Sequence, residues 1–199
     1  MLCCSVHPAR YDPDVEKDLR PSLHPAWGFA AAGFYVTHAI SLVRVGDAPH
    51  ALWSCHLACL VLAAGILLRR PTLAGIALMW LLVGLPTWVM ATFTEEGWFN
   101  PTSTLTHVFG LVLAAVAVRT SGMPVGTWRH AMAGLAALWI LTRLVVPPGS
   151  NVNITRDYWF GWEAAYLSFP AYLAILGALV AGLYFGIEKL VRAIGWRRE

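Results

Sequence analysis

Long apolar stretches, separated by short polar or proline-containing breaks, dominate this amino-acid sequence. Of its 199 residues, 58% are hydrophobic and only 13% are charged, whereas a typical soluble domain carries about 25% charged residues. A stretch of roughly 17–25 apolar residues is long enough to cross a bilayer as a helix. Lipid offers the backbone no hydrogen-bond partners, so helices are the expected structure for such stretches. The sequence therefore predicts an all-α polytopic membrane protein.

Six transmembrane helices can be drawn, and we expect them to form one six-transmembrane-helix bundle. Their predicted bounds are 27–45, 48–68, 73–93, 101–118, 128–146 and 163–191. Arginine, glycine and proline clusters near 70, 123 and 148 punctuate the pattern, as expected for helix ends. Asp47 and Asn100 are expected to cap two of the helices. Residues 1–25 would precede this transmembrane domain (26–192), and a basic tail (193–199) would follow it.

The distribution of Lys and Arg among the loops predicts the orientation of the bundle. The loop at Arg69-Arg70 and the loop between Arg119 and Arg129 are basic, as is the C-terminal tail, whereas the turn at 94–97 is acidic. Basic loops stay on the cytoplasmic side. Both termini should therefore be cytoplasmic, with the 148–162 loop on the other side. The mild net charge of +3 gives no reason to expect nucleic acid as a partner.

Ionisable side chains recur at one depth within these stretches. His38, Cys55 and His107 each lie roughly seven or eight residues from the same end of an apolar stretch, which is about 11 Å below one face of the bilayer. An ionisable side chain within a membrane is costly, so its first interpretation is functional. The candidate site adds the residues expected near these three, namely His56, Thr87, Asn151 and Asn153.

Cys55 would need an imidazole partner to react, because only a thiolate is nucleophilic. We expect it two turns into its helix, beyond the reach of the favourable helix N-terminus and in a low-dielectric setting that disfavours the thiolate. His56 is its neighbour in sequence but points about 100° away around a helix. A histidine on another helix, His107 or His38, can face the cysteine directly, which favours His107 as the base or as an imidazolium partner.

Each candidate also has a structural interpretation. A membrane histidine can hydrogen-bond a neighbouring helix, and Thr87 is expected to bond its own backbone or an adjacent helix. Asn151 and Asn153 follow two prolines, where asparagine is a common turn residue. The recurrence of histidines at one depth beside a cysteine favours a site over these interpretations.

Five short motifs follow one another along about residues 50–190: Ser54-Cys55-His56-Leu57, Thr106-His107-Val108, Gly126-Thr127-Trp128-Arg129, Gly149-Ser150-Asn151-Val152-Asn153 and Phe169-Pro170-Ala171-Tyr172. Together they resemble the YwaF-like integral membrane proteins, which include the eukaryotic transmembrane protein 164 type. The eukaryotic members are described as cysteine-dependent acyltransferases that remodel ether phospholipids. The resemblance therefore implies Cys55 as nucleophile and His107 as base, although Ser54 stands where the eukaryotic type has proline.

The expected function is transfer of an acyl chain between phospholipids through Cys55, without a metal or other cofactor. His38, His56 or Asn153 would orient the substrate or stabilise the oxyanion. The expected partners are membrane lipids, and the expected location is the inner (plasma) membrane of a bacterium. Two alternatives stay open. One is a haem-, pigment- or metal-binding protein that uses the histidines as ligands, and the other is a non-catalytic accessory subunit of a larger membrane complex.

Overall fold

The computed structural model describes residues 23–94, 100–158 and 168–196, and within these ranges the chain is helical without a β-strand. The prediction of an all-α protein is confirmed for this part of the chain. The predicted N-terminal segment, the acidic residues of the 94–97 turn and the predicted start of the last span at Glu163 lie outside the described residues. The helices are α2 (Pro25–Arg44), α3 (Ser54–Leu67), α4 (Pro71–Thr94), α5 (Pro101–Thr104), α6 (Gly110–Ser121), α7 (Thr127–Val145) and α8 (Phe169–Ala193).

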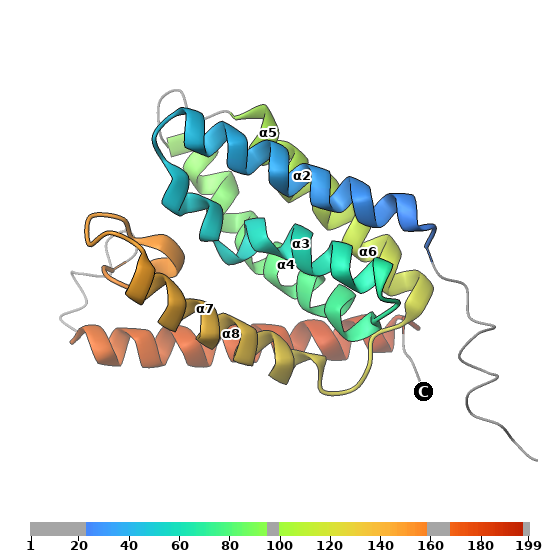
Figure 1. The fold of residues 1–199 in the computed structure, drawn as a ribbon. Helices are drawn as coiled ribbons and strands as arrows, with labels where there is room; N and C mark the ends of the chain where they lie inside the picture. Colours follow the sequence, from blue (N-terminus) through green and yellow to red (C-terminus); the bar gives the residue numbers. More distant parts are fainter. Residues whose placement is uncertain (1–22, 95–99, 159–167, 197–199) are drawn as a thin grey trace, which may run out of the picture.

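Consecutive long helices run in opposite directions (Figure 1). A π-helical turn, Leu105–Phe109, joins α5 to α6 into one continuous segment. The helix α4 lies at the centre, where it packs against α3, α6, α7 and α8, while α2 packs against α3 and the α5–α6 segment. The start of α3, the end of α2 and the start of α5 meet at one end of the molecule (Figure 1). This arrangement brings residues from three separate helical segments together.

Four helical segments are long and apolar enough to cross a membrane: 25–44, 71–93, 101–121 and 169–193. They correspond to four of the predicted spans, so the prediction of a membrane protein is supported by length and composition. The predicted spans 48–68 and 128–146 correspond to α3, which has only 14 residues, and to α7, which is not among the four. The predicted count of six spans is not confirmed.

Large apolar side chains remain exposed on the outer surface of this bundle. They include Phe29, Val36, Ile40 and Val43 of α2, Val112 and Val116 of α6, Ile140 and Leu144 of α7, and Leu179 and Leu183 of α8. Soluble monomers rarely expose contiguous apolar surface of this kind. Apolar faces of this kind favour a lipid environment.

The second predicted span is not one helix. A short 3-10 turn (Ala48–Leu52) comes first, and α3 begins only at Ser54. The side chain of Asn153 bonds the carbonyl of Leu52 and the amide of Ser54, so these two groups take no part in a continuous helix. The expectation that Cys55 lies two turns into its helix is therefore wrong. Cys55 is the second residue of α3.

Candidate functional site

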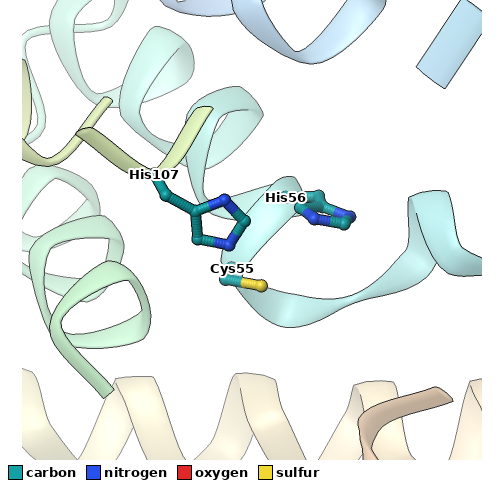
Figure 2. A group of neighbouring side chains, drawn as sticks. All are labelled: Cys55, His56 and His107. Atoms are coloured by element: carbon teal, nitrogen blue, oxygen red, sulfur yellow. The ribbon is translucent and has the colours of Figure 1, made fainter. Parts of the chain in front are cut away.

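Three buried side chains converge where α3 meets the π-helical turn. The ligand-type atoms of Cys55, His56 and His107 all lie within 4.8 Å of one another, and Figure 2 shows the three side chains approaching from these two segments. Cys55 is 5%, His56 8% and His107 2% exposed. The expected approach of Cys55 to His107 across about 50 residues of sequence is thus confirmed, whatever role the two residues have.

His107 is held by its own helical segment and by α4. It lies in the π-helical turn Leu105–Phe109, a local geometry that is frequent at functional sites. Its Nδ1–H donates to the carbonyl oxygen of Ser103 (2.9 Å), and the indole of Trp88 stacks on its ring, with centroids 5.3 Å apart. Because Nδ1 carries the proton, Nε2 of the neutral ring presents a lone pair.

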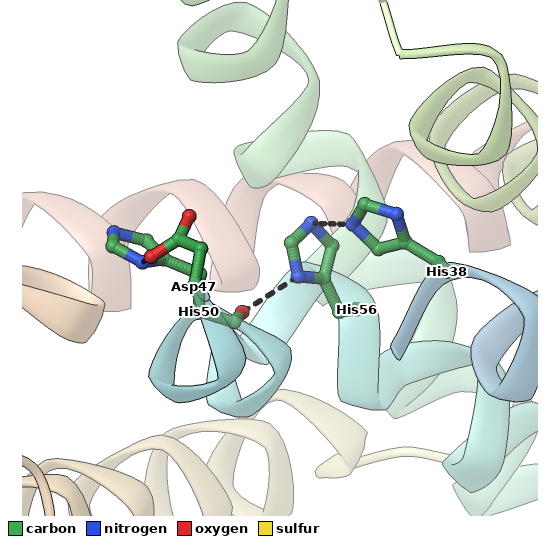
Figure 3. A network of polar contacts seen from close by, with 4 residues as sticks. All are labelled: His38, Asp47, His50 and His56. Atoms are coloured by element: carbon green, nitrogen blue, oxygen red, sulfur yellow. Dashed lines mark hydrogen bonds and ion pairs between the residues drawn. The ribbon is translucent and has the colours of Figure 1, made fainter. Parts of the chain in front are cut away.

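His56 is oriented in the same way. Its Nδ1–H donates to the backbone carbonyl of His50 (2.8 Å), which lies in the 3-10 turn before α3. Its Nε2 lies 3.2 Å from Nε2 of His38. Figure 3 shows both contacts. The ring of His50 itself faces the carboxylate of Asp47 and stays outside this contact.

His38 extends the group onto a third segment. It projects from α2, is 2% exposed, and has its Nδ1 3.0 Å from the hydroxyl of Thr102 in α5. Thr102 is in turn bonded to Asn100, whose side chain caps α5 as predicted. The structure thus brings His38, His56, His107 and Cys55 into one continuous polar group inside an apolar bundle.

Cys55 lies in the first turn of α3, where the helix N-terminus favours a negatively charged group. The helix N-terminus therefore offsets part of the cost of burying a thiolate here, a contribution that a position two turns into the helix would lack. Helix α4 reaches the cysteine because residue 84 is glycine: a Cβ atom there would lie 2.5 Å from Cβ of Cys55. The thiol is enclosed by protein on this side.

Asn153 positions Cys55 through the backbone. Its Oδ1 accepts from the amide of Ser54 (2.8 Å) and its Nδ2 donates to the carbonyl of Leu52 (2.9 Å). The residue is buried and adopts a φ of 54°, a left-handed conformation that asparagine tolerates. Its expected role as an orienting residue fits this geometry, but what it orients is the start of α3.

Two predicted residues are hydrogen-bonded elsewhere. The Thr87 hydroxyl donates to the carbonyl of Gly84 in its own helix (2.6 Å), which is the structural interpretation of that residue. Asn151 organises its loop: its Oδ1 accepts from the amides of Arg156 and Asp157. Neither contact gives these residues a part in chemistry at Cys55.

Several groups that shape the site are absent from the predicted set. Ser103 and His50 act through their carbonyls, and Thr102 acts through its hydroxyl. The spacing of Ser103 and His107 by four residues in a helix is a usable signal, because such side chains face the carbonyl one turn back. Backbone acceptors leave no comparable signature in a sequence.

The shared feature of the three histidines is a hydrogen-bond partner at Nδ1, which leaves Nε2 directed elsewhere. Histidines that ligate metals almost always have such a partner at the other ring nitrogen. Imidazole and thiolate together are ligands suited to zinc and related transition metals. The group therefore has the composition and the orientation of a metal site.

No protein-family model matches the chain, and no curated protein or solved structure matches it either.

Proposed function

We propose that this chain is an integral membrane protein that binds a divalent transition-metal ion, of the zinc type, through Cys55, His56 and His107. The observation that carries the proposal is the convergence of their three ligand-type atoms within 4.8 Å in a buried setting. The proposal departs from the expectation of a metal-free site, which followed from the resemblance. It takes up instead the alternative in which the histidines are ligands.

The spacing of these atoms is compatible with binding after a small contraction. With metal–nitrogen distances of about 2.0–2.1 Å and a metal–sulfur distance of about 2.3 Å, the ligands of a tetrahedral site lie about 3.3–3.6 Å apart. The ligand-type atoms of the three residues lie within 4.8 Å of one another, so they must move about 1 Å closer together to reach these distances. Rotation about the side-chain torsions can supply such an approach.

Burial favours a metal over a lipid substrate at this position. Polar and ionisable groups inside a membrane are costly unless they pair with something, and a bound cation would pair with all three. The thiolate would also neutralise part of the metal's charge. Only 5% of Cys55 is exposed, so a phospholipid ester would need a rearrangement to reach its sulfur.

The test is the metal content of the full-length protein purified in detergent without chelators. We expect about one metal ion per chain, and we expect His56→Ala and His107→Ala to lose it. His130→Ala is the matched control, because His130 is exposed on α7. Metal at background level in the unmodified protein, or equal content in all four proteins, would refute the proposal.

Acyl transfer is the second candidate, and one observation favours it. Cys55 and His107 lie within reach, and His107 has the tautomer that a base needs, since its Nδ1–H is held by Ser103. His107 would take the thiol proton, the sulfur would attack a phospholipid ester, and a thioester would form as the lysolipid leaves with that proton. A lysophospholipid hydroxyl would then accept the acyl group and return the thiol.

These two candidates exclude each other at Cys55, because a thiolate bound to a metal is not free to attack. Incubating metal-depleted protein with phospholipid vesicles, followed by mass spectrometry of the intact chain, separates them. An added acyl mass that Cys55→Ser lacks and Cys59→Ser retains supports acyl transfer. An unchanged mass, with metal restored on dialysis against Zn²⁺, supports the metal site.

We further propose that α3 and α7 also lie within the membrane, which gives a six-helix bundle with both termini in the cytoplasm. Two observations support this: consecutive helices alternate in direction (Figure 1), and α7 exposes Ile140 and Leu144. The basic loops favour the orientation. The resemblance favours the inner membrane of a bacterium.

A further inference from the structure

We infer that His38 is a further ligand of this site and that the bound cation lies between Nε2 of His38 and Nε2 of His56. The inference rests on the proposed metal site and extends it to three histidines and one cysteine. His38 lies outside the group whose ligand-type atoms are all within 4.8 Å of one another, so its Nε2 must move closer to Cys55 or His107 on binding. The role of His38 follows from counting the hydrogens available to the two imidazoles.

The Nδ1 atom of His38 must carry a proton. The amide of Thr102 donates to Oδ1 of Asn100 (2.9 Å), so this atom of Asn100 is an oxygen and accepts only. The hydroxyl of Thr102 donates to the same oxygen (2.6 Å). That hydroxyl has a single hydrogen and has none left for His38. The contact of 3.0 Å between His38 and Thr102 is therefore a donation from Nδ1–H to the hydroxyl oxygen.

The Nδ1 atom of His56 must carry a proton as well, because its partner is the backbone carbonyl of His50. A neutral imidazole has only one N–H. The two Nε2 atoms therefore face each other with lone pairs at 3.2 Å, an arrangement that repels unless a cation lies between them. Figure 3 shows this pair and the carbonyl that fixes His56.

A metal ion fits this separation. Two nitrogens bound to a tetrahedral ion at about 2.0–2.1 Å lie about 3.3–3.4 Å apart, close to the observed 3.2 Å. The His38–His56 pair is thus already at ligand spacing. His38, His56 and His107 all hold a hydrogen-bond partner at Nδ1, respectively Thr102, His50 and Ser103, which is the support that metal-bound histidines require.

A shared proton is the competing occupant, and it is less well supported here. An imidazolium buried in a membrane bundle calls for a nearby anion. Among the described residues no carboxylate is hydrogen-bonded to either ring, and the nearby carboxylate of Asp47 is bonded to the ring of His50 instead. A metal ion can bind the thiolate of Cys55 as well as both Nε2 atoms, whereas a single proton between two nitrogens has no bond to the sulfur.

Titration of the metal-depleted full-length protein with Co²⁺ tests this inference. Tetrahedral Co²⁺ gives intense visible bands, and thiolate ligation adds a charge-transfer band in the near ultraviolet. We expect both bands for the unmodified protein. Loss of the hydrogen-bond partner of a metal-ligating histidine typically weakens metal binding about 10- to 100-fold. His38→Ala removes a ligand itself, so we expect it to weaken Co²⁺ binding at least about 100-fold. The visible bands should lose intensity.

The matched control is His130→Ala, because His130 is exposed on α7 and hydrogen-bonds the carbonyl of Gly126 at the start of its own helix. We expect its affinity and spectrum to be unchanged. If His38→Ala fails to fold, Thr102→Val replaces it as the test. This variant removes the hydroxyl that accepts from Nδ1 of His38 and donates to Asn100, and it should weaken metal binding about 10- to 100-fold.

The outcomes separate the two proposals. Binding by the unmodified protein with unchanged affinity in His38→Ala, or in Thr102→Val where it serves as the test, overturns the role of His38 and leaves the proposed function intact. Absence of binding by the unmodified protein for both Co²⁺ and Zn²⁺ overturns the proposed function and the inference together.

Discussion

Nε2 of His38 and Nε2 of His56 lie 3.2 Å apart although the two residues are on different helices, α2 and α3. Their rings meet edge to face, with centroids 4.3 Å apart. The contact connects the packing of the bundle to its chemistry, because the distance between these helices sets the distance between two ligand atoms. Substitutions that move α2 or α3 should therefore act on metal binding even when they touch no ligand.

Cys55 and Cys59 should differ sharply on replacement by serine. Cys55→Ser should abolish the thiolate-to-cobalt charge-transfer band and weaken metal binding, because a serine hydroxyl is a poor ligand for zinc-type ions. Cys59 is buried against Gly110 and points its thiol at the carbonyl of Thr106, so Cys59→Ser should retain the band. Absorption spectra of both Co²⁺-loaded variants check this. Equal spectra for the two would contradict the assignment of Cys55.

Gly84→Ala should disturb the site through packing. The added Cβ would lie 2.5 Å from Cβ of Cys55, and overpacking of this kind costs about 1–3 kcal/mol. We expect a lower unfolding temperature in detergent and weaker Co²⁺ binding. The control is Gly33→Ala in α2, where nothing lies within 4 Å of the added atom. Its stability should be unchanged or slightly higher, because alanine favours a helix. A Gly84→Ala protein that matches Gly33→Ala in both measurements would show that this contact is unimportant.

Asn153→Asp should loosen the start of α3. The carboxylate can still accept from the amide of Ser54 but cannot donate to the carbonyl of Leu52, and an unmade hydrogen bond at a buried group costs about 1–3 kcal/mol. We expect faster amide hydrogen exchange at Cys55 and His56, together with weaker metal binding. Unaltered exchange at both amides would separate Asn153 from the site.

Glu188 should stabilise the fold at the opposite end of the bundle. Its buried carboxylate accepts from the backbone amides of Gly126 and Trp128, both at 3.0 Å, where α7 begins. Glu188→Ala leaves both amides unpaired, and we expect a loss of about 1–3 kcal/mol in unfolding free energy. Glu188→Gln keeps one acceptor oxygen and should lose less. Metal binding should survive in both variants. A stability of Glu188→Ala equal to that of the unmodified protein would argue against this role.

Accessibility of engineered cysteines tests the proposed orientation. In a background with Cys3→Ser and Cys4→Ser, the remaining Cys55 and Cys59 are buried. In intact cells a membrane-impermeant maleimide should label Ile154→Cys, whereas Trp196→Cys should react only after permeabilisation. The reverse labelling pattern would show that the bundle has the opposite orientation in the membrane.

Much of the helical arrangement could be predicted from the sequence, because membrane spans are set by the length and hydropathy of continuous stretches. The cap at Asn100 could be predicted for a similar reason, since the asparagine precedes the proline that starts the helix. The break before Ser54 could not. It depends on Asn153, whose side chain reaches the backbone from about 100 positions away in the chain.

The candidate site, too, could be predicted from the sequence only in part. The similar positions of His38, Cys55 and His107 along their apolar stretches predicted that the three lie near one another, although the stretch before Cys55 is a 3-10 turn and not part of α3. The direction of each ring was not predictable. It depends on the carbonyls of His50 and Ser103 and on the hydroxyl of Thr102, and acceptors of the backbone carry no residue-specific signal.

The most direct test of the proposed centre is X-ray absorption at the metal edge of the purified full-length protein after loading with Zn²⁺. We expect about one sulfur at about 2.3 Å and about three nitrogens at about 2.0–2.1 Å around each metal ion, with the sulfur absent in Cys55→Ser. Failure to retain stoichiometric metal, or a shell of nitrogen and oxygen without sulfur in the unmodified protein, would contradict a centre built from Cys55 and the three histidines.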